Sequence, residues 1–192
     1  MQGKKSMHVL EAIKTRRSIR KYKNDPIAID DLNLILESIR WTPSWANTQC
    51  WEVIVVTEKE KRKKLLEAFP PKNPGVQAVV TAPIVLVLAG KKGVSGYYKG
   101  KAVTIYGDWF MFDVALAMQN LVLTAHSLGL GTVILGYFDH KKVSEILNLP
   151  DDIKVVAMTP LGYPEEIPQP PSRKTLTDFV SYESFAKRTS SL

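Results

Sequence analysis

Three arginines and a serine stand together near the start of the chain, in the run Arg16-Arg17-Ser18-Ile19-Arg20. A planar guanidinium matches two phosphate oxygens at once, and a hydroxyl group can add a further hydrogen bond. A second basic pair, Arg173-Lys174, follows a proline-rich stretch near the other end. Only folding could bring the two clusters to one phosphate. Taken alone, the first run is better explained as a basic helix end that complements the helix dipole.

A polar loop with two tryptophans is the second candidate, Pro43-Ser44-Trp45-Ala46-Asn47-Thr48-Gln49-Cys50-Trp51. The amides of Asn47 and Gln49 can each donate and accept hydrogen bonds at the edge of a heterocycle. Trp45 or Trp51 could cover the face of such a ring. The alternative is a polar turn followed by a tryptophan that begins a strand.

Several common catalytic motifs are absent from the sequence. The run that starts at Gly129 has Ile134 where a dinucleotide fingerprint needs glycine, and no phosphate-binding loop of the nucleotide triphosphatases occurs. Gly93 to Gly96 has the wrong spacing for a nucleophile elbow, and the three histidines form no paired metal motif. We therefore expect neither acyl transfer nor a metal site.

Composition indicates one ordinary globular domain spanning residues 1–192, with 45% apolar residues and a single cysteine, Cys50. The apolar runs are too short to cross a bilayer, so we expect a cytoplasmic protein without a membrane partner. The formal net charge is +7, but the basic residues are scattered, and the run 59–64 fits the solvated face of a helix. A phosphate-bearing small molecule is thus favoured over nucleic acid, and a basic nucleic-acid-binding module stays open as the alternative.

These candidate residues must be positioned by alternating helices and strands. Periodicity and breakers predict helices from Ser6 to Thr15, from an Asp30 cap to the residues before Pro43, and over 58–69 and 143–147. Buried strands are predicted at 51–57 and 84–89, and shorter strands at 132–136 and 155–161. The glycine- and lysine-rich segment 90–104 is expected to be a mobile or lid-like loop.

Two longer features complete the predicted architecture. Residues 105–128 are apolar around much of the helical circumference, which predicts a long helix buried on more than one side. Prolines stiffen residues 163–192, an arm that carries Phe179, Val180, Tyr182 and Phe185. These side chains must be buried, either against a partner subunit or against the arm's own domain.

The order of these motifs along the chain resembles that of the flavin-dependent nitroreductase family. The resemblance rests on the arginine run, the Pro43 to Trp51 loop, Asn120-Leu121 before Gly129-Leu-Gly131 and Gly136, Leu161-Gly162-Tyr163-Pro164, and Arg173-Lys174. It covers nearly the whole chain. The resemblance implies an α+β fold with a central mixed β-sheet flanked by helices, in an intertwined homodimer whose C-terminal arms are exchanged.

The resemblance also implies two FMN molecules at the dimer interface. Arg20 would approach the pyrimidine edge of the flavin and stabilise the charge that develops there, and Asn47 would hydrogen-bond the ring. The partner chain would supply Ser44 and Trp45, beside Pro43. The remaining implied contacts are Arg16, Arg17, Ser18, Arg173 and Lys174 at the phosphate and ribityl chain, and Leu135 and Gly136 near flavin N5.

The implied activity is a ping-pong reduction with no catalytic side chain. Hydride passes from NADH or NADPH to flavin N5 and then to a nitroaromatic, a quinone or a similar acceptor. Alternatives on the same fold are reductive dehalogenation, flavin fragmentation and FMN binding without turnover. Two features depart from the family pattern. Cys50 stands where the family commonly has proline, and the segment 70–104 is short and lysine-rich. Because larger members of the family have a longer cap over the substrate site in that segment, the acceptor is the expectation that transfers least well.

Overall fold

A four-stranded antiparallel sheet forms the centre of the protein in the computed structural model, which describes residues 7–188. Its strands are β1 (Trp51–Val56), β2 (Ile84–Lys91), β6 (Ile153–Gly162) and β5 (Gly131–Thr132), in that spatial order. All three pairings are antiparallel. The expected mixed sheet is therefore wrong. Parallel pairing among the described residues is limited to the single bridge Ser18–Thr132, because each connection between neighbouring strands returns to the end of the sheet that it left.

Strand β2 carries the hydrophobic core on both of its faces. Val85 and Val87 pack into one cluster, and Leu86 and Leu88 pack into the other. Successive side chains of a strand point to opposite faces, so an unbroken apolar run is what a strand covered on both sides requires. The predicted strand at 84–89 is confirmed, and the structure extends it to Lys91.

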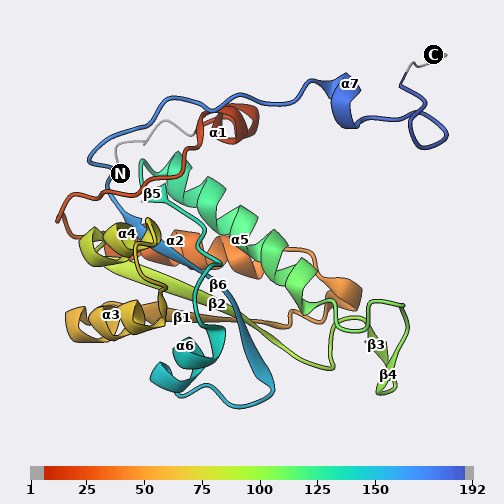
Figure 1. Cartoon of the computed structure of the whole chain (residues 1–192), viewed down its shortest axis with the longest axis horizontal. Coiled ribbons are helices and arrows are strands. Elements are labelled where there is room, and N and C mark those ends of the chain that lie inside the picture. The colour runs from red at the N-terminus through yellow and green to blue at the C-terminus, as the bar shows by residue number, and fades with distance from the viewer. Residues whose placement is uncertain (1–6, 189–192) are drawn as a thin grey trace.

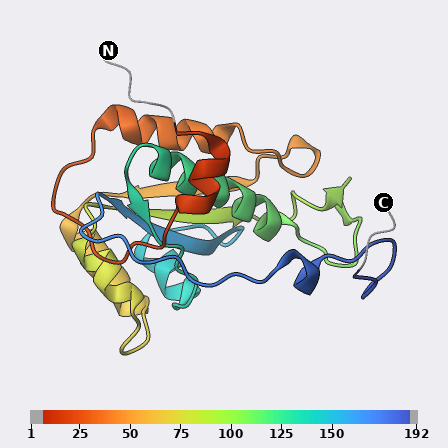
Figure 2. The same cartoon turned by 90° about the horizontal axis from the view of Figure 1, so that it is seen from above.

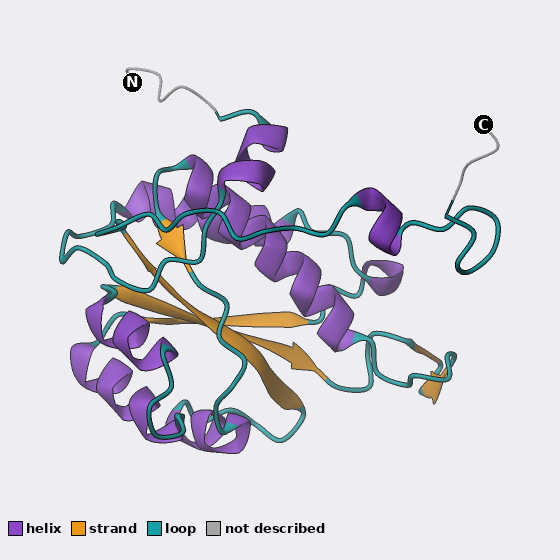
Figure 3. Ribbon diagram, turned by 45° about the horizontal axis from the view of Figure 1, so that its top comes forward, coloured by secondary structure: helices purple, strands orange, loops and turns teal. Residues whose placement is uncertain are grey.

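Helices cover both faces of the sheet (Figure 3). One layer consists of α2 (Ile29–Arg40) and α5 (Phe110–Ser127), with α1 (Val9–Thr15) packed on α5. The other layer consists of α3 (Lys59–Leu65), α4 (Gly75–Thr81) and α6 (His140–Ile146). The arrangement in Figure 1 is thus helices, sheet, helices.

Two predicted helix starts need correction. The N-cap of α2 is Ala28, and Asp30 lies inside the first turn, where its carboxylate suits the helix dipole. Helix α5 begins at Phe110 because the chain turns at Gly107, whose φ is +68°. Its 18 residues span about 27 Å instead of the longer helix expected over 105–128. The predicted cap Ser6 lies outside the described residues.

Within one chain, α5 is buried along a single face. The buried side chains are Asp113, Val114, Ala117, Met118, Leu121, Val122 and Ala125. Met111 and Phe112 are more than half exposed. The expectation of burial on more than one side is therefore not met by this chain alone, and the exposed apolar residues are left for other contacts.

Three predicted segments differ in detail. Strand β1 is an edge strand and only partly buried, because it pairs with β2 alone. The strand expected at 132–136 shortens to β5 followed by a single bridge between Leu135 and Met158. The segment 90–104 contains a hairpin of β3 (Tyr97–Tyr98) and β4 (Lys101–Ala102), which projects from the body (Figure 1).

The C-terminal arm leaves the body of the domain (Figure 1, Figure 2). It is extended as far as α7 (Leu176–Phe179), which begins with a capping box at Thr175. Beyond α7 the arm makes a turn in which the Tyr182 amide donates to the Lys187 carbonyl over 2.8 Å. Phe179 is 60% exposed and Phe185 is 92% exposed. The arm does not bury these side chains against its own domain. Among the described residues, none of the helices has the length and apolar character that a bilayer crossing requires.

Candidate functional site: an arginine-lined cavity and a separate aromatic cavity

The two basic clusters of the sequence meet at one cavity of about 270 Å³. Its walls come from the run after α1 and from the start of the arm, and its lining residues are Arg16, Arg17, Ser18, Arg20, Pro168, Gln169, Pro171 and Arg173. Lys174 is exposed and does not belong to this lining. Folding thus brings together four of the five predicted basic residues and Ser18.

Backbone pairing explains this convergence. The amide of Ile19 donates to the carbonyl of Thr132 over 2.9 Å, which fixes the arginine run along β5. The amide of Glu165 donates to the carbonyl of Lys21 over 3.1 Å, and Lys23 donates to Tyr163 over 2.9 Å. The arm therefore starts beside the arginine run, and Arg173 is carried back over it.

Positive charge accumulates at this cavity. None of the ion pairs of residues 7–188 involves one of its four arginines. The pKa of Arg16 is lowered from its ordinary value, chiefly by burial and then by repulsion from Arg173 and Arg17. Several guanidinium groups held together in this way form a site for an anion, and the fork geometry suits phosphate.

The loop after α2 has a strained backbone. Ala46, Asn47 and Gln49 have φ values of +43°, +55° and +47°, a region that side-chain-bearing residues rarely adopt. The hydroxyl of Ser44 accepts a hydrogen bond from the Gln49 amide over 2.9 Å, and the Asn47 side-chain oxygen accepts one from the Gln49 side chain over 3.2 Å. Clustered strain of this kind is typical of functional loops.

Asp113 is a functional candidate that the sequence analysis missed. Its side chain is 1% exposed and lies on α5. One carboxylate oxygen accepts a hydrogen bond from the Trp45 amide over 3.1 Å, and the other accepts one from the Cys50 thiol over 3.4 Å. Asp113 thereby fixes the loop at both ends. A single acid on the apolar face of a predicted helix was the signal that could have identified it.

A second cavity, of about 220 Å³, lies where this loop meets α5. Its lining residues are Pro43, Ser44, Trp45, Trp109, Phe112, Asp113 and Leu116. The rings of Trp45 and Trp109 are 5.3 Å apart at their centroids, as are those of Trp109 and Phe112. Such a surface suits an apolar, planar group, and Trp109 and Phe112 were not among the predicted site residues.

The two cavities have no lining residue in common. Pro43, Ser44 and Trp45 therefore do not meet the arginine run within one chain. Asn47 is exposed and lines neither cavity. One chain presents two separate parts of a candidate site, one basic and one aromatic.

Leu135 and Gly136 lie apart from both cavities, between β5 and α6. Leu135 exchanges two backbone hydrogen bonds with Met158, of 2.8 and 3.0 Å. Gly136 is exposed, and a Cβ added there would meet nothing within 4 Å. This open backbone could be approached closely by a flat ligand.

His126 lies next to the arginine run. Its Nε2 is 2.8 Å from the hydroxyl of Thr15, and its ring is half-buried. Burial, and then the charges of Arg16 and Arg17, lower its pKa from the ordinary value. This placement is that of a hydrogen-bonded structural histidine.

Comparisons with known proteins agree on one family. The sequence model of the Nitroreductase family matches residues 13–163. A protein of Methanothermobacter thermautotrophicus that is described as an NADH dehydrogenase/NAD(P)H nitroreductase is 34% identical over 173 residues. The match covers 88% of this chain and 84% of that protein. The FMN reductase (NAD(P)H) of Bacillus subtilis is 28% identical over 169 residues, covering 82% of this chain and 66% of that protein. The crystal structure of a nitroreductase family protein from Clostridium novyi NT has a TM-score of 0.75 at 30% identity, and the match covers 93% and 95% of the two chains.

Proposed function

Because this chain belongs to the nitroreductase family, whose members are FMN-dependent oxidoreductases, we propose that it transfers hydride from NADH or NADPH to a small electron acceptor. A nitroaromatic or a quinone is the acceptor class that we propose. The observation that carries this proposal is the convergence of Ser18 and four arginines on one cavity, where none of the arginines forms an ion pair with another described residue. Such a donor set fits the phosphate of FMN.

The arginine cavity is assigned to the phosphate and ribityl end of the cofactor. Arg16, Arg17 and Arg173 offer guanidinium forks, and Ser18 adds a hydroxyl. Arg20 stands at the same cavity and is exposed, so its charge can reach the pyrimidine edge of the ring. The exposed Lys174 can add charge at the rim.

A complete site requires a second copy of the chain. The aromatic cavity with Pro43, Ser44 and Trp45 is separate from the arginine cavity in one chain, as it would be if each site took one part from each subunit. Asn47 would bond the ring, and Leu135 and Gly136 would lie near its reactive centre. We propose a homodimer with two FMN sites, held together by the exposed face of α5 and by the exchanged arms.

The bound FMN would supply the chemistry, by accepting hydride from the nicotinamide and passing it to the acceptor. The chain's contribution is to bind, to orient and to stabilise charge. Arg20 is the residue placed to stabilise negative charge that develops on the pyrimidine side of the ring. No catalytic side chain is assigned. The buried thiol of Cys50 agrees with the cytoplasm as the proposed compartment.

The test is an absorption spectrum of the purified protein, recorded before and after anaerobic addition of NADH or NADPH. The flavin bands should bleach with one or both donors and recover when a nitroaromatic or quinone is added. A bound flavin that never bleaches would leave an FMN protein with other chemistry. A colourless protein that takes up no FMN but binds DNA or RNA with steep salt dependence would support the nucleic-acid alternative.

A further inference from the structure

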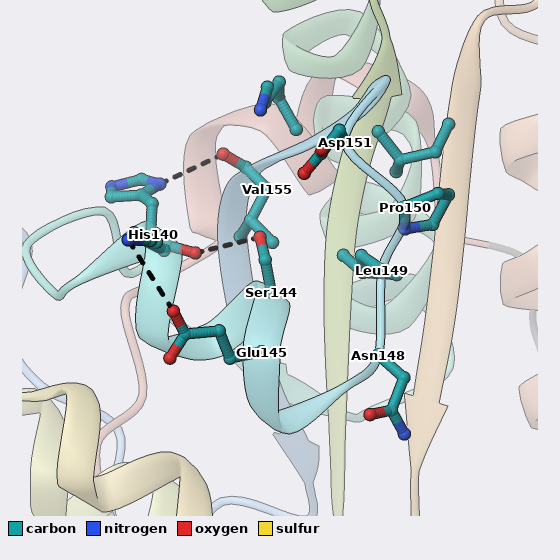
Figure 4. A pocket seen from close by; sticks show the side chains of 11 residues that line it. His140, Ser144, Glu145, Asn148, Leu149, Pro150, Asp151 and Val155 are labelled. Carbon is teal, nitrogen blue, oxygen red and sulfur yellow. Dashed lines mark hydrogen bonds and ion pairs between the residues drawn. The ribbon is translucent and has the colours of Figure 1, made fainter.

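Both ring nitrogens of His140 face backbone carbonyl oxygens. Nδ1 is 3.0 Å from the carbonyl oxygen of Val155 in β6, and Nε2 is 3.1 Å from that of Gly136 (Figure 4 draws the first contact). A carbonyl oxygen only accepts hydrogen bonds, so each contact needs an N–H on the ring. Neutral imidazole carries one N–H and protonated imidazole carries two. Both hydrogen bonds can therefore form only when the ring is protonated.

The surroundings of His140 suit a charged ring. Its plane stacks on Phe138 with a centroid separation of 4.3 Å and an interplanar angle of 24°. A cation over an aromatic face is favourable. Phe138 itself is 7% exposed, so it offers a fixed surface for the ring.

Solvent reaches the ring through an open cavity of about 550 Å³ that His140 helps to line (Figure 4). The charged side chains of this cavity balance: Lys141 and Glu145 of α6 form an ion pair of 3.9 Å, and Asp151 and Lys154 lie at or before β6. On the neighbouring turns, Asp139 caps α6, and Glu67 pairs with Lys142 over 3.2 Å. Because these charges balance, the groups that favour protonated His140 over neutral His140 are the two carbonyl oxygens.

The Gly136 carbonyl belongs to a turn that is fixed elsewhere by neutral groups. Leu135 is paired with Met158, and the side-chain amide of Asn73 donates to the Tyr137 carbonyl over 2.8 Å. Between these two fixed points, His140 supplies the side-chain donor for Gly136. Loss of the ring proton would remove one of its two bonds and leave a lone pair facing an oxygen.

We propose that protonated His140 is a positioning residue, which ties Gly136 to β6 and so holds the turn that would meet the flavin. This inference rests on the proposed FMN site. Loss of either ring proton breaks one of the two contacts, so the turn should loosen when His140 loses its charge. His140 then makes flavin binding depend on pH without touching the cofactor.

The first experiment uses the protein without added cofactor. Side-chain ¹⁵N NMR of the uniformly labelled protein is recorded from pH 5.5 to 8.5, with His8→Gln and His126→Gln used to assign the three histidines. Both nitrogens of His140 should carry protons at the acid end. The Leu135 amide donates to Met158, and its hydrogen-exchange rate, divided at each pH by the rate of an unstructured peptide, should rise as the second proton leaves. A neutral His140 at pH 5.5, or exchange that ignores its titration, would overturn the proposal.

The second experiment measures FMN affinity by fluorescence quenching between pH 6.5 and 8.5. The flavin phosphate titrates near pH 6, so the quantity of interest is the difference between wild type and His140→Gln. The dissociation constant of wild type should rise about tenfold more than that of the variant, as expected for one charge-assisted hydrogen bond. His8→Gln, which changes an exposed histidine, should follow wild type.

Equal pH profiles for wild type and His140→Gln would refute the role of His140 and leave the proposed function intact. Failure to bind FMN at any pH would instead refute the proposed function. In that case the NMR titration still decides whether protonated His140 holds Gly136. The two failures are therefore distinguishable.

Discussion

Arg20 is the single residue on which the proposed chemistry depends most. Its guanidinium lines the arginine cavity and is exposed. Among the described residues, the hydrogen bond that it forms is a long contact of 3.4 Å with the Ser18 carbonyl. We predict that Arg20→Ala slows flavin reduction by about 100-fold, the effect typical of removing one donor to developing negative charge, while FMN occupancy falls much less. Stopped-flow reduction at saturating FMN measures this.

Arg20→Lys is the matched control, since it keeps the charge and loses the planar fork. It should retain most of the reduction rate. An unchanged rate in Arg20→Ala would remove Arg20 from the assigned role. Equal losses of rate and occupancy would make it a binding residue instead.

Cys50 illustrates how burial decides the chemistry of a residue. The pKa of the Cys50 thiol is raised to about 12. Burial is the largest cause, followed by the hydrogen bond to Asp113 and the negative charge of Asp113. At pH 8 only about one thiol in 10⁴ is then ionised, and the thiolate is the reactive form. We predict that iodoacetamide labels the native protein at least 100-fold more slowly than the protein unfolded in urea, as followed by mass spectrometry.

The labelling rate should rise with pH up to the highest pH at which the protein stays folded, because the folded-state pKa lies above that of an ordinary thiol. Asp113→Asn removes the negative charge beside the thiol and should speed labelling. Burial is the larger cause, so the variant should remain slower than the unfolded chain. Equal rates for native and unfolded protein would contradict the buried placement.

At the level of elements, two glycines are predicted to have different roles. Gly131 allows close packing within the protein, and Gly136 leaves space for a ligand. A Cβ at Gly131 in β5 would lie 2.7 Å from Ile19, whereas a Cβ at Gly136 would meet nothing within 4 Å. We predict that Gly131→Ala lowers the free energy of unfolding by about 1–3 kcal/mol through overpacking. Gly136→Ala should change it by less than about 0.5 kcal/mol. Urea denaturation without cofactor measures both.

The same pair tests the assigned flavin face. Gly136→Ala should keep its fold and lose FMN affinity, because the added methyl group occupies space that the cofactor would use. Equilibrium dialysis with FMN gives the comparison. Normal FMN affinity in a stable Gly136→Ala protein would show that the backbone of Gly136 does not face the flavin.

At the scale of the whole molecule, the exposed apolar surface indicates association. The arm leaves Leu176 71% exposed and Phe185 92% exposed, and α1 exposes Val9, Leu10 and Ile13 by more than half. Such surface is costly in water unless another chain covers it. We predict that the protein sediments as a dimer, at twice its chain mass of 21.5 kDa.

Deletion of residues 175–192 should shift this dimer towards the monomer at micromolar concentration. It retains Arg173 and removes α7 and the exposed Phe185 beyond it. The far-UV circular dichroism should change little, since the deleted segment adds little to the core. Deletion of 189–192 alone is the control. A wild-type monomer, or a truncated chain that dimerises as tightly as wild type, would refute arm exchange.

Much of the fold could be predicted from the sequence because its strongest signals are local. The unbroken apolar run at 84–89 can be satisfied only by a strand covered on both faces, which β2 is. The lysine-rich helix predicted over 58–69 is confirmed as α3, but it ends at Leu65, and Phe69 follows a short 3-10 turn in extended conformation. The ordered motifs also predicted the family, which the comparisons confirmed.

Sequence reasoning failed where a neighbour decides the outcome. The run at 53–56 reads as a buried strand, but β1 lies at the edge of the sheet because only β2 pairs with it. Asp113 looks like one polar residue in an apolar helix. Its role appears only when α5 brings it to Trp45 and Cys50.

By itself, then, the sequence determined most of the element types and the chemical character of the arginine run and the tryptophan loop. These depend on periodicity and side-chain type, which are local properties. Only the tertiary structure decided that Arg173 joins Arg16 and Arg17, because backbone pairing between Glu165 and Lys21 closes that distance. It also decided that the tryptophan loop lies elsewhere, since which segments meet depends on how the whole chain packs.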